Sequence, residues 1–300
     1  MPAPRRAAWG HLQATTLAHR AATLVGGRSR DRRTEVQARA GAGADPGARP
    51  PAPVVLADLW ADLGPRERAQ VASPLGDGRP GPLHLGTAPA RQSDGTTCGS
   101  TVLAMLAAAG DPVLALWLVT GRLLPGHLPP ELRHVPAAVL TSTDAEVRFA
   151  GLQRATKRVT NRRAVGPLPW PAALGTPPWG AARTARFGDV RFTHVLIDDT
   201  DGAHLSRVLD RADAALACGV PVPLFTGGGV ARGVTTALPR HVVLLVPHAR
   251  PADGGGGGLA VYEPGRGLVH RVTRADLAGT AGPVPALGGW SHVCWALLPA

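Results

Sequence analysis

The chain has 300 residues, a hydrophobic content of 44% and a formal net charge of +11, which allows one large domain or two small ones with a substantial apolar core. Every basic side chain except Lys157 is an arginine, in a chain that is rich in Ala, Gly and Pro. A GC-rich coding sequence produces this composition, so the charge alone does not indicate nucleic-acid binding, and we expect no nucleic-acid partner.

The three cysteines, Cys98, Cys218 and Cys294, lie far apart and form no CxxC pair. An odd number of widely spaced cysteines predicts neither a disulfide framework nor a zinc site, and free thiols are typical of a reducing compartment. The first 27 residues lack an apolar signal core. No apolar stretch approaches the roughly 20 residues of a membrane helix. We therefore expect a cytoplasmic protein without a membrane span.

The chain begins with a segment that has the composition of a tail. Residues 7–24 could form a short helix, but residues 26–53 are rich in Gly, Ala, Arg and Pro without periodicity, which is typical of flexible segments. We predict a flexible tail over residues 1–53 and one folded domain over residues 54–300. The domain is expected to start with a short helix over 54–63, and residues 64–90 are rich in turn-forming residues.

Apolar segments predict helices in the first half of the domain. Residues 99–109 are apolar on nearly all sides, which predicts a buried helix that ends at Gly110-Asp111-Pro112. A second apolar stretch covers residues 113–124. A third and longer helix is expected over residues 143–163.

One face of the third helix carries three arginines four residues apart: Arg154, Arg158 and Arg162. Such a stripe is more simply explained as a solvent-exposed face than as a ligand site. The loop that follows, over residues 166–180, is rich in Pro and holds Trp170 and Trp179. Its aromatic side chains would either line a peptide groove or pack the loop onto the domain.

The second half of the domain is rich in short apolar runs bounded by Gly-rich turns. These runs predict strands over residues 190–197, 220–225, 241–246, 259–262, 268–272 and 292–298. A helix is expected over residues 202–218, because Leu205, Leu209 and Leu216 share one face. The Gly-rich turns lack the lysine and spacing of a phosphate loop. Helices followed by a mostly antiparallel sheet predict an α+β fold.

The most informative residue is Cys98, which lies directly before the predicted buried helix and is followed by Gly99. A thiol attacks as a thiolate, which the N-terminal end of a helix and a nearby imidazole both stabilise. The backbone N–H of Cys98 and the side-chain amide of Gln92, six residues upstream, are candidate donors to an oxyanion. A buried helix also holds its first residue rigidly.

A histidine and a carboxylate complete the candidate site. His241 opens an apolar strand 143 positions after Cys98, within the 130–150 spacing of papain-type sites. Glu263 closes the next strand. A turn between neighbouring antiparallel strands can bring a strand-end carboxylate close to a strand-start histidine, where it would fix the tautomer of the imidazole.

Other polar residues offer weaker candidates. His194 also opens an apolar run, but a helix rather than a second strand follows it, so His241 is preferred as the base. Asp198, Asp199 and Asp201 could suggest a metal loop, although Asp201-Gly202 is more simply a turn and a helix cap. For Cys218 and Cys294 we expect small buried hydrophobic side chains. No metal and no cofactor are therefore expected.

Five elements occur in the order seen in the papain-like cysteine peptidases, and over residues 85–300 the chain resembles their bacterial branch of double-glycine-leader peptidases. The elements are Gln92, Cys98-Gly99-Ser100, Gly219-Val220-Pro221-Val222, His241-Val242-Val243 and Glu263-Pro264-Gly265-Arg266-Gly267. Two departures are Glu263, where the family usually has Asp, and Ser100, where a Pro is common. A glutamate is one methylene longer, so it is expected to orient His241 less firmly.

The resemblance implies a papain-like fold, in which the helix that carries Cys98 packs on the C-terminal sheet. It also implies cleavage of peptide or isopeptide bonds through an acyl-enzyme. In this reading Cys98 attacks, His241 acts as base and then acid, Glu263 orients the imidazole and Gln92 stabilises the oxyanion. The partner would be a peptide or protein substrate. The alternatives are an inactive peptide-binding relative and a transamidase or amidase that uses the same residues.

Overall fold

The computed structural model describes residues 59–228, 239–248, 258–278 and 282–300. The predicted tail, and the start of the domain at residue 54, lie outside these residues and stay predictions. The strands of the main sheet, in order from edge to edge, are β1 (Gly81–Pro82), β9 (Leu268–Val272), β8 (Leu259–Glu263), β7 (His241–Val246), β6 (Val222–Gly227), β10 (His292–Pro299), β5 (Val190–Leu196) and β4 (Arg186–Phe187). All neighbouring pairs in this sheet are antiparallel.

Helices precede most of these strands in the chain, so the α+β class is confirmed. The α-helices are α4 (Pro65–Ala72), α5 (Cys98–Gly110), α6 (Pro112–Thr120), α7 (Ala137–Leu140), α8 (Ala145–Asn161), α9 (Pro178–Thr184) and α10 (Gly202–Ala217). Short 3₁₀ turns are η2 (Pro130–His134), η3 (Ala172–Leu174), η6 (Ala275–Leu277) and η7 (Pro285–Leu287). A separate hairpin pairs β2 (His84–Leu85) with β3 (Ala88–Pro89).

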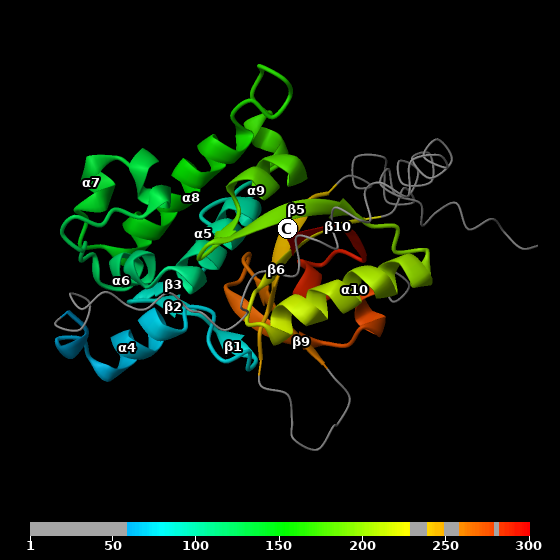
Figure 1. Cartoon of the computed structure of the whole chain (residues 1–300), viewed down its shortest axis with the longest axis horizontal. Coiled ribbons are helices and arrows are strands. Elements are labelled where there is room, and N and C mark those ends of the chain that lie inside the picture. Colours follow the sequence, from blue (N-terminus) through cyan, green and yellow to red (C-terminus); the bar gives the residue numbers. More distant parts are fainter. Residues whose placement is uncertain (1–58, 229–238, 249–257, 279–281) are drawn as a thin grey trace, which may run out of the picture.

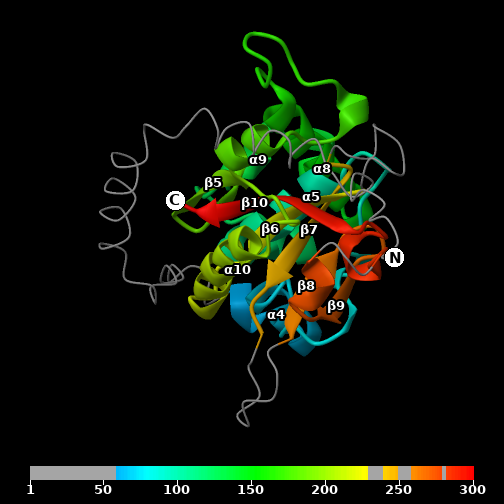
Figure 2. The same cartoon turned by 90° about the vertical axis from the view of Figure 1, so that its right-hand side faces the viewer.

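The core is built on the middle strands of the sheet. Every residue of β6, and all of β7 except its first, is buried, as expected for apolar strands that are covered on both faces. Helix α5 packs against β7 on one side, and α10 packs against β10 and β6 on the other (Figures 1 and 2). The predicted apolar face of α10, which includes Leu205 and Leu209, is buried there.

Helices α5 and α6 are buried almost throughout. In the part of the chain that the structure describes, no single helix has the length and apolar character needed to cross a membrane. Together α5 and α6 reach that length and composition, but the pair is bent by 115°. The bend falls at Asp111, whose side chain caps α6 by accepting hydrogen bonds from the backbone N–H groups of Val113 and Leu114.

Residues 64–90 contain turns, and they also include α4, which the sequence analysis did not single out. This helix has Pro65 at its first position and is capped by Glu67, whose Oε2 accepts a hydrogen bond from the backbone N–H of Gly64 at 2.9 Å. Proline at N1 and an acidic residue two positions later are helix-start signals. The low apolar content of the helix, in which only Val71 is buried, explains why its periodicity is weak.

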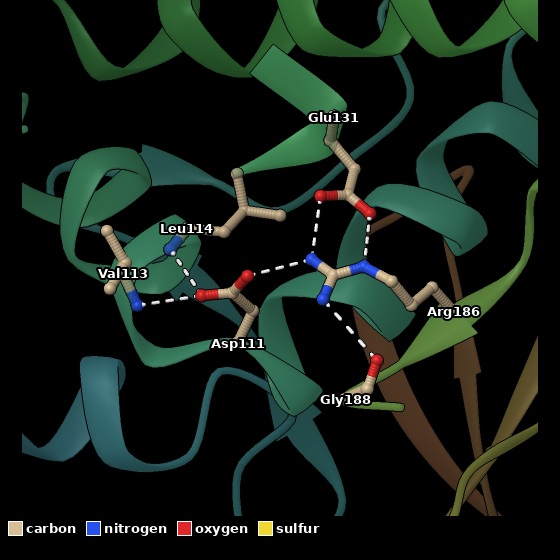
Figure 3. A network of polar contacts seen from close by, with 6 residues as sticks. All are labelled: Asp111, Val113, Leu114, Glu131, Arg186 and Gly188. Carbon is tan, nitrogen blue, oxygen red and sulfur yellow. Dashed lines mark hydrogen bonds and ion pairs between the residues drawn. The ribbon is translucent and has the colours of Figure 1, made fainter. Parts of the chain in front are cut away.

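Arg186 joins the sheet to the helical part of the molecule. Its guanidinium is bidentate to Glu131 of η2, with both distances 2.8 Å, and it also reaches Asp111 at 2.7 Å (Figure 3). Burial would lower the pKa of Arg186, but its hydrogen bonds and charge interactions with Glu131 and Asp111 outweigh burial and raise it. One strand-edge residue thus holds the helix cap of α6 and the η2 turn together.

We expect Arg186→Met to lower the free energy of unfolding by about 3 kcal/mol, because two largely buried carboxylates would lose their shared partner. The side chains of Arg186, Asp111 and Glu131 are only 13–15% exposed. The matched control is Arg274→Met, which removes ion pairs from a side chain that is 40% exposed and should cost less than about 1 kcal/mol. Urea unfolding measures both; equal losses would contradict a special role of Arg186.

Candidate active site

The segment before α5 is held rigidly, which fixes the position of Cys98. Gln153 of α8 is buried; its side-chain oxygen accepts from the backbone N–H of Ser93 at 2.8 Å, and its side-chain nitrogen donates to the carbonyl of Arg91 at 2.9 Å. The carboxylate of Asp94 accepts hydrogen bonds from both the backbone and the hydroxyl of Thr96. These contacts on both sides of the segment leave it little freedom.

Cys98 is the first residue of α5, so the helix begins one residue earlier than the sequence predicts. The residue is 5% exposed. Gly99 is required behind it, because a Cβ there would lie 2.7 Å from the Cβ of Thr176 and 3.3 Å from a methyl of Val242. The start of α5 therefore lies directly against β7, the strand that His241 opens.

His241 and Glu263 are hydrogen bonded to each other, with 2.7 Å between Nε2 and Oε1. The pairing of β7 with β8 explains the contact, since Leu244 is opposite Tyr262. Continued by one residue, this register brings Glu263 opposite Val243, whose side chain points to the same side of the strand as that of His241. The predicted encounter of a strand-end carboxylate with a strand-start histidine is therefore present.

His241 and Glu263 each stabilise the charged form of the other. Burial would lower the pKa of His241, but hydrogen bonding and charge interaction with Cys98 and Glu263 outweigh it and raise the pKa to about 9. For Glu263, burial acts to raise the pKa, and the hydrogen bond to His241 together with backbone donors lowers it. An ionised Glu263 can only accept, so Nε2 of His241 carries a proton and Nδ1 remains to exchange one with the thiol.

Glu263 is held more firmly than its length suggests. It is 3% exposed and accepts hydrogen bonds from the backbone N–H groups of Gly265 at 2.6 Å and Arg266 at 2.9 Å, in addition to that from His241. A Cβ on Gly265 would lie 2.8 Å from Oε1 of Glu263, so this glycine leaves room for the carboxylate. The turn after β8 compensates for the extra methylene, and the expected looseness is not seen.

Gln92 connects the carboxylate turn with the cysteine segment. Its backbone N–H donates to the carbonyl of Pro264 at 2.8 Å, and its side-chain nitrogen donates to the carbonyl of Asp94 at 2.9 Å. The hydroxyl of Tyr262 also donates to the carbonyl of Ala90 at 2.5 Å. Gln92 is thus tied to both parts of the site, and one of its amide hydrogens is engaged by Asp94.

The remaining candidates lie elsewhere. His194 is on β5, which β10 and β6 separate from β7. Three strand spacings correspond to about 14 Å, so His194 is not a rival base. Cys294 is buried, as expected, but Cys218 is exposed at the end of α10. That expectation was wrong for Cys218 because the residue lies past the last apolar position of the helix.

The side chains of Asp198, Asp199 and Asp201 have structural contacts, and that of Asp198 accepts hydrogen bonds from the backbone and hydroxyl of Thr200. Asp201 caps α10 by accepting from the backbone N–H groups of Ala203 and His204, which confirms the predicted cap. Asp199 accepts from His292 at 2.9 Å and from the backbone N–H of Val293 at 3.1 Å. Among the residues that the structure describes, no group of three or more His, Cys, Asp or Glu side chains could hold a metal ion.

Gly288, which the sequence analysis did not single out, lies against the imidazole of His241. Its φ is +71°, and a Cβ there would lie 2.3 Å from Cδ2 and 2.7 Å from Nε2 of His241. The loop that carries it is anchored by the hydroxyl of Thr226, which donates to the carbonyl of Leu287 at 3.0 Å. The sequence feature that could have indicated this position is the Gly288-Gly289 pair, because glycines allow the backbone to approach another group closely.

We expect Gly288→Ala to slow alkylation of Cys98 by iodoacetamide about tenfold to a hundredfold near pH 6, because the new methyl group displaces the imidazole. The matched control is Gly289→Ala, whose φ is +80° but whose Cβ would meet nothing within 4 Å. It imposes similar backbone strain without touching His241. Equal rates in the two variants, measured by mass spectrometry of the Cys98 peptide, would rule out this positioning role.

Comparisons with known proteins identify no relative. No protein-family model, no curated protein and no solved structure matches the chain.

Proposed function

We propose that the chain is a papain-like thiol hydrolase that cleaves peptide or isopeptide bonds through Cys98, His241 and Glu263. The observation that supports this most is the 2.7 Å contact between His241 and Glu263, in a histidine whose pKa Cys98 also helps to raise. A thiol, an imidazole and an orienting carboxylate are the parts that acyl transfer to sulfur requires.

In the proposed reaction the proton of Cys98 is already on Nδ1 of His241 before substrate binds, as a thiolate–imidazolium pair, because the pKa of His241 is raised to about 9. The thiolate attacks the carbonyl carbon of the scissile bond, and the carbonyl π electrons move onto oxygen. When the tetrahedral intermediate collapses, the C–N bond breaks and His241 protonates the leaving amine. Water, deprotonated by His241, then attacks the thioester and releases the acid and the thiol.

Charge on the tetrahedral oxygen needs donors. The backbone N–H of Cys98 lies in the first turn of α5, where helix N–H groups have no intrahelical acceptor. Gln92 has a second amide hydrogen besides the one that Asp94 accepts. These two groups are our proposed oxyanion donors.

One observation favours a second reading, that of an inactive peptide-binding relative. Cys98 is 5% exposed and His241 is 11% exposed, so substrate must displace side chains to reach the thiol. A transamidase would use the same acyl-enzyme with an amine in place of water. A hydrolase transfers the acyl group to water, a transamidase transfers it to an amine, and an inactive relative binds the peptide without cleaving it.

The test is cleavage of a peptide library by the wild-type chain and by Cys98→Ala. Wild type should release new peptide termini and the variant should release none. Incorporation of a labelled amine instead of water would identify a transamidase. Peptide binding without cleavage, at equal affinity in both proteins, would contradict the hydrolase and support the inactive relative.

A further inference from the structure

A hollow of about 750 Å³ lies beside the segment that leads into Cys98. One wall is α8 and the residue after it, and the other is the Pro/Trp-rich loop with Trp170. We call the hollow the basic groove, because it is lined by four cationic side chains: Arg154, Lys157, Arg158 and Arg162. The arginine stripe of α8 is thus more than the plain exposed face that the sequence suggested.

The positive charge of the basic groove is only partly neutralised by the protein, because four cations face one carboxylate, that of Asp94, which interacts electrostatically with Lys157 and Arg154. None of the four cations forms an ion pair with a carboxylate among the described residues. Two of the charged groups form hydrogen bonds to neutral atoms: Lys157 donates to the hydroxyl of Thr96, and Arg158 donates to the carbonyl of His134. One carboxylate, that of Asp94, also lines the hollow. An excess of cations in a concave site concentrates anionic ligands.

The basic groove is next to the proposed catalytic residues. Thr97, directly before Cys98, lines it together with Asp94. Arg154 also lines a second hollow of about 400 Å³ that includes Gln92 and Gly265. Neither hollow includes Cys98 or His241, so the charge flanks the thiol rather than surrounding it.

The opposite wall supplies aromatic and apolar surface. Trp170 lines the groove and packs edge to face on Trp179, with 5.4 Å between the ring centroids. The indole N–H of Trp170 is buried and has no acceptor among the described residues. In the same loop Leu168 is 64% exposed. A ligand that offers both carboxylate oxygens and apolar groups would match these features.

We propose that the basic groove binds acidic side chains of the peptide substrate and makes the chain selective for peptides with Asp or Glu beside the scissile bond. Arginine guanidinium groups bind carboxylates in bidentate geometry, and a subsite beside the segment that leads into Cys98 would position the carbonyl for attack. The role of the groove in substrate selection rests on the proposed hydrolase function. Its binding of acidic side chains rests only on the residues that line it.

The test is binding of fluorescein-labelled hexaglutamate and hexaglutamine peptides to the full chain with Cys98→Ala. The groove variant, Arg154→Gln with Arg162→Gln, removes two groove cations that form no salt bridge among the described residues, although the charge of Arg154 interacts with that of Asp94. The matched control, Arg207→Gln with Arg211→Gln, removes the same charge from the exposed face of α10. We expect the groove variant to bind hexaglutamate about tenfold more weakly and the control to bind it within about twofold of the parent.

Three results would overturn the proposal: equal affinity for hexaglutamine, equal losses in the two variants, or tighter groove-dependent binding of a thymidine 12-mer, which would identify a nucleic-acid surface instead. Thermal unfolding of both variants checks that they fold. Alkylation of Cys98 by iodoacetamide separates this proposal from the proposed function. An unreactive Cys98 with selective hexaglutamate binding would contradict the hydrolase alone, and a reactive Cys98 without such binding would contradict the groove alone.

Discussion

His241→Ala is expected to lower the rate of peptide cleavage about 10⁴-fold, close to the residual level of Cys98→Ala, because triad residues act as a unit. In the proposed mechanism the imidazole takes the thiol proton and returns it to the leaving amine, and this variant removes it. The hydrogen bond at 2.7 Å would also be lost, leaving Glu263 buried with only its two backbone donors. Steady-state cleavage of a peptide selected from the library measures the effect.

The matched control for His241→Ala is His194→Ala. His194 is an exposed histidine on another strand of the same sheet, and desolvation lowers its pKa. Its strand is three positions away from β7 in the sheet. Cleavage should be unchanged in this control. A comparable loss in both variants would show that general destabilisation, rather than loss of the base, explains the effect of His241→Ala.

Glu263→Gln is expected to slow cleavage about 10²- to 10⁴-fold at neutral pH and to move the alkaline limit of activity to lower pH. Glu263 helps to raise the pKa of His241 to about 9. Below that pH the folded protein holds the imidazolium that protonates the leaving amine, and activity is lost as the pH rises through about 9. Removing the carboxylate charge lowers the pKa of His241, so the loss begins earlier.

The pH–rate profile of wild type and Glu263→Gln checks this prediction. The matched control is Asp199→Asn, which alters the other buried carboxylate–histidine pair, where Asp199 contacts His292 at 2.9 Å. That change should affect stability but leave the alkaline limit in place. An unshifted limit in Glu263→Gln would mean that Glu263 does not set the charge of His241.

Much of the fold could be predicted because the apolar pattern dictates it. The runs that became β7 and β9 were predicted with the bounds that the structure has, and α10 was predicted to within one residue. The pairing of His241 with Glu263 also followed from local reasoning, since a turn between adjacent strands limits where their ends can lie. The apolar pattern and the order of the strands along the chain were therefore sufficient to predict these elements.

Other features depend on contacts between distant segments, which one sequence does not reveal. Gly288 meets His241 only because η7 folds back over the sheet, and the clamp of Gln153 on the cysteine segment joins residues 60 positions apart. The three arginines of α8 had the spacing of an exposed face; only the loop around Trp170 turns that face into a groove. Glu263 is likewise fixed by hydrogen bonds from two backbone N–H groups, and the types of the residues in the sequence do not predict such bonds.

The most direct test of the proposed site is the rate of alkylation of each cysteine by iodoacetamide near pH 6, resolved by peptide mass spectrometry. An unassisted thiol, with a pKa of about 8.5, is almost fully protonated there. Cys218 is exposed and Cys98 is 5% exposed, so accessibility alone favours Cys218. We predict that Cys98 reacts faster than Cys218 and that His241→Ala abolishes its advantage. A Cys98 that reacts no faster than Cys218, or that is unaffected by loss of His241, would contradict the assignment of the active site.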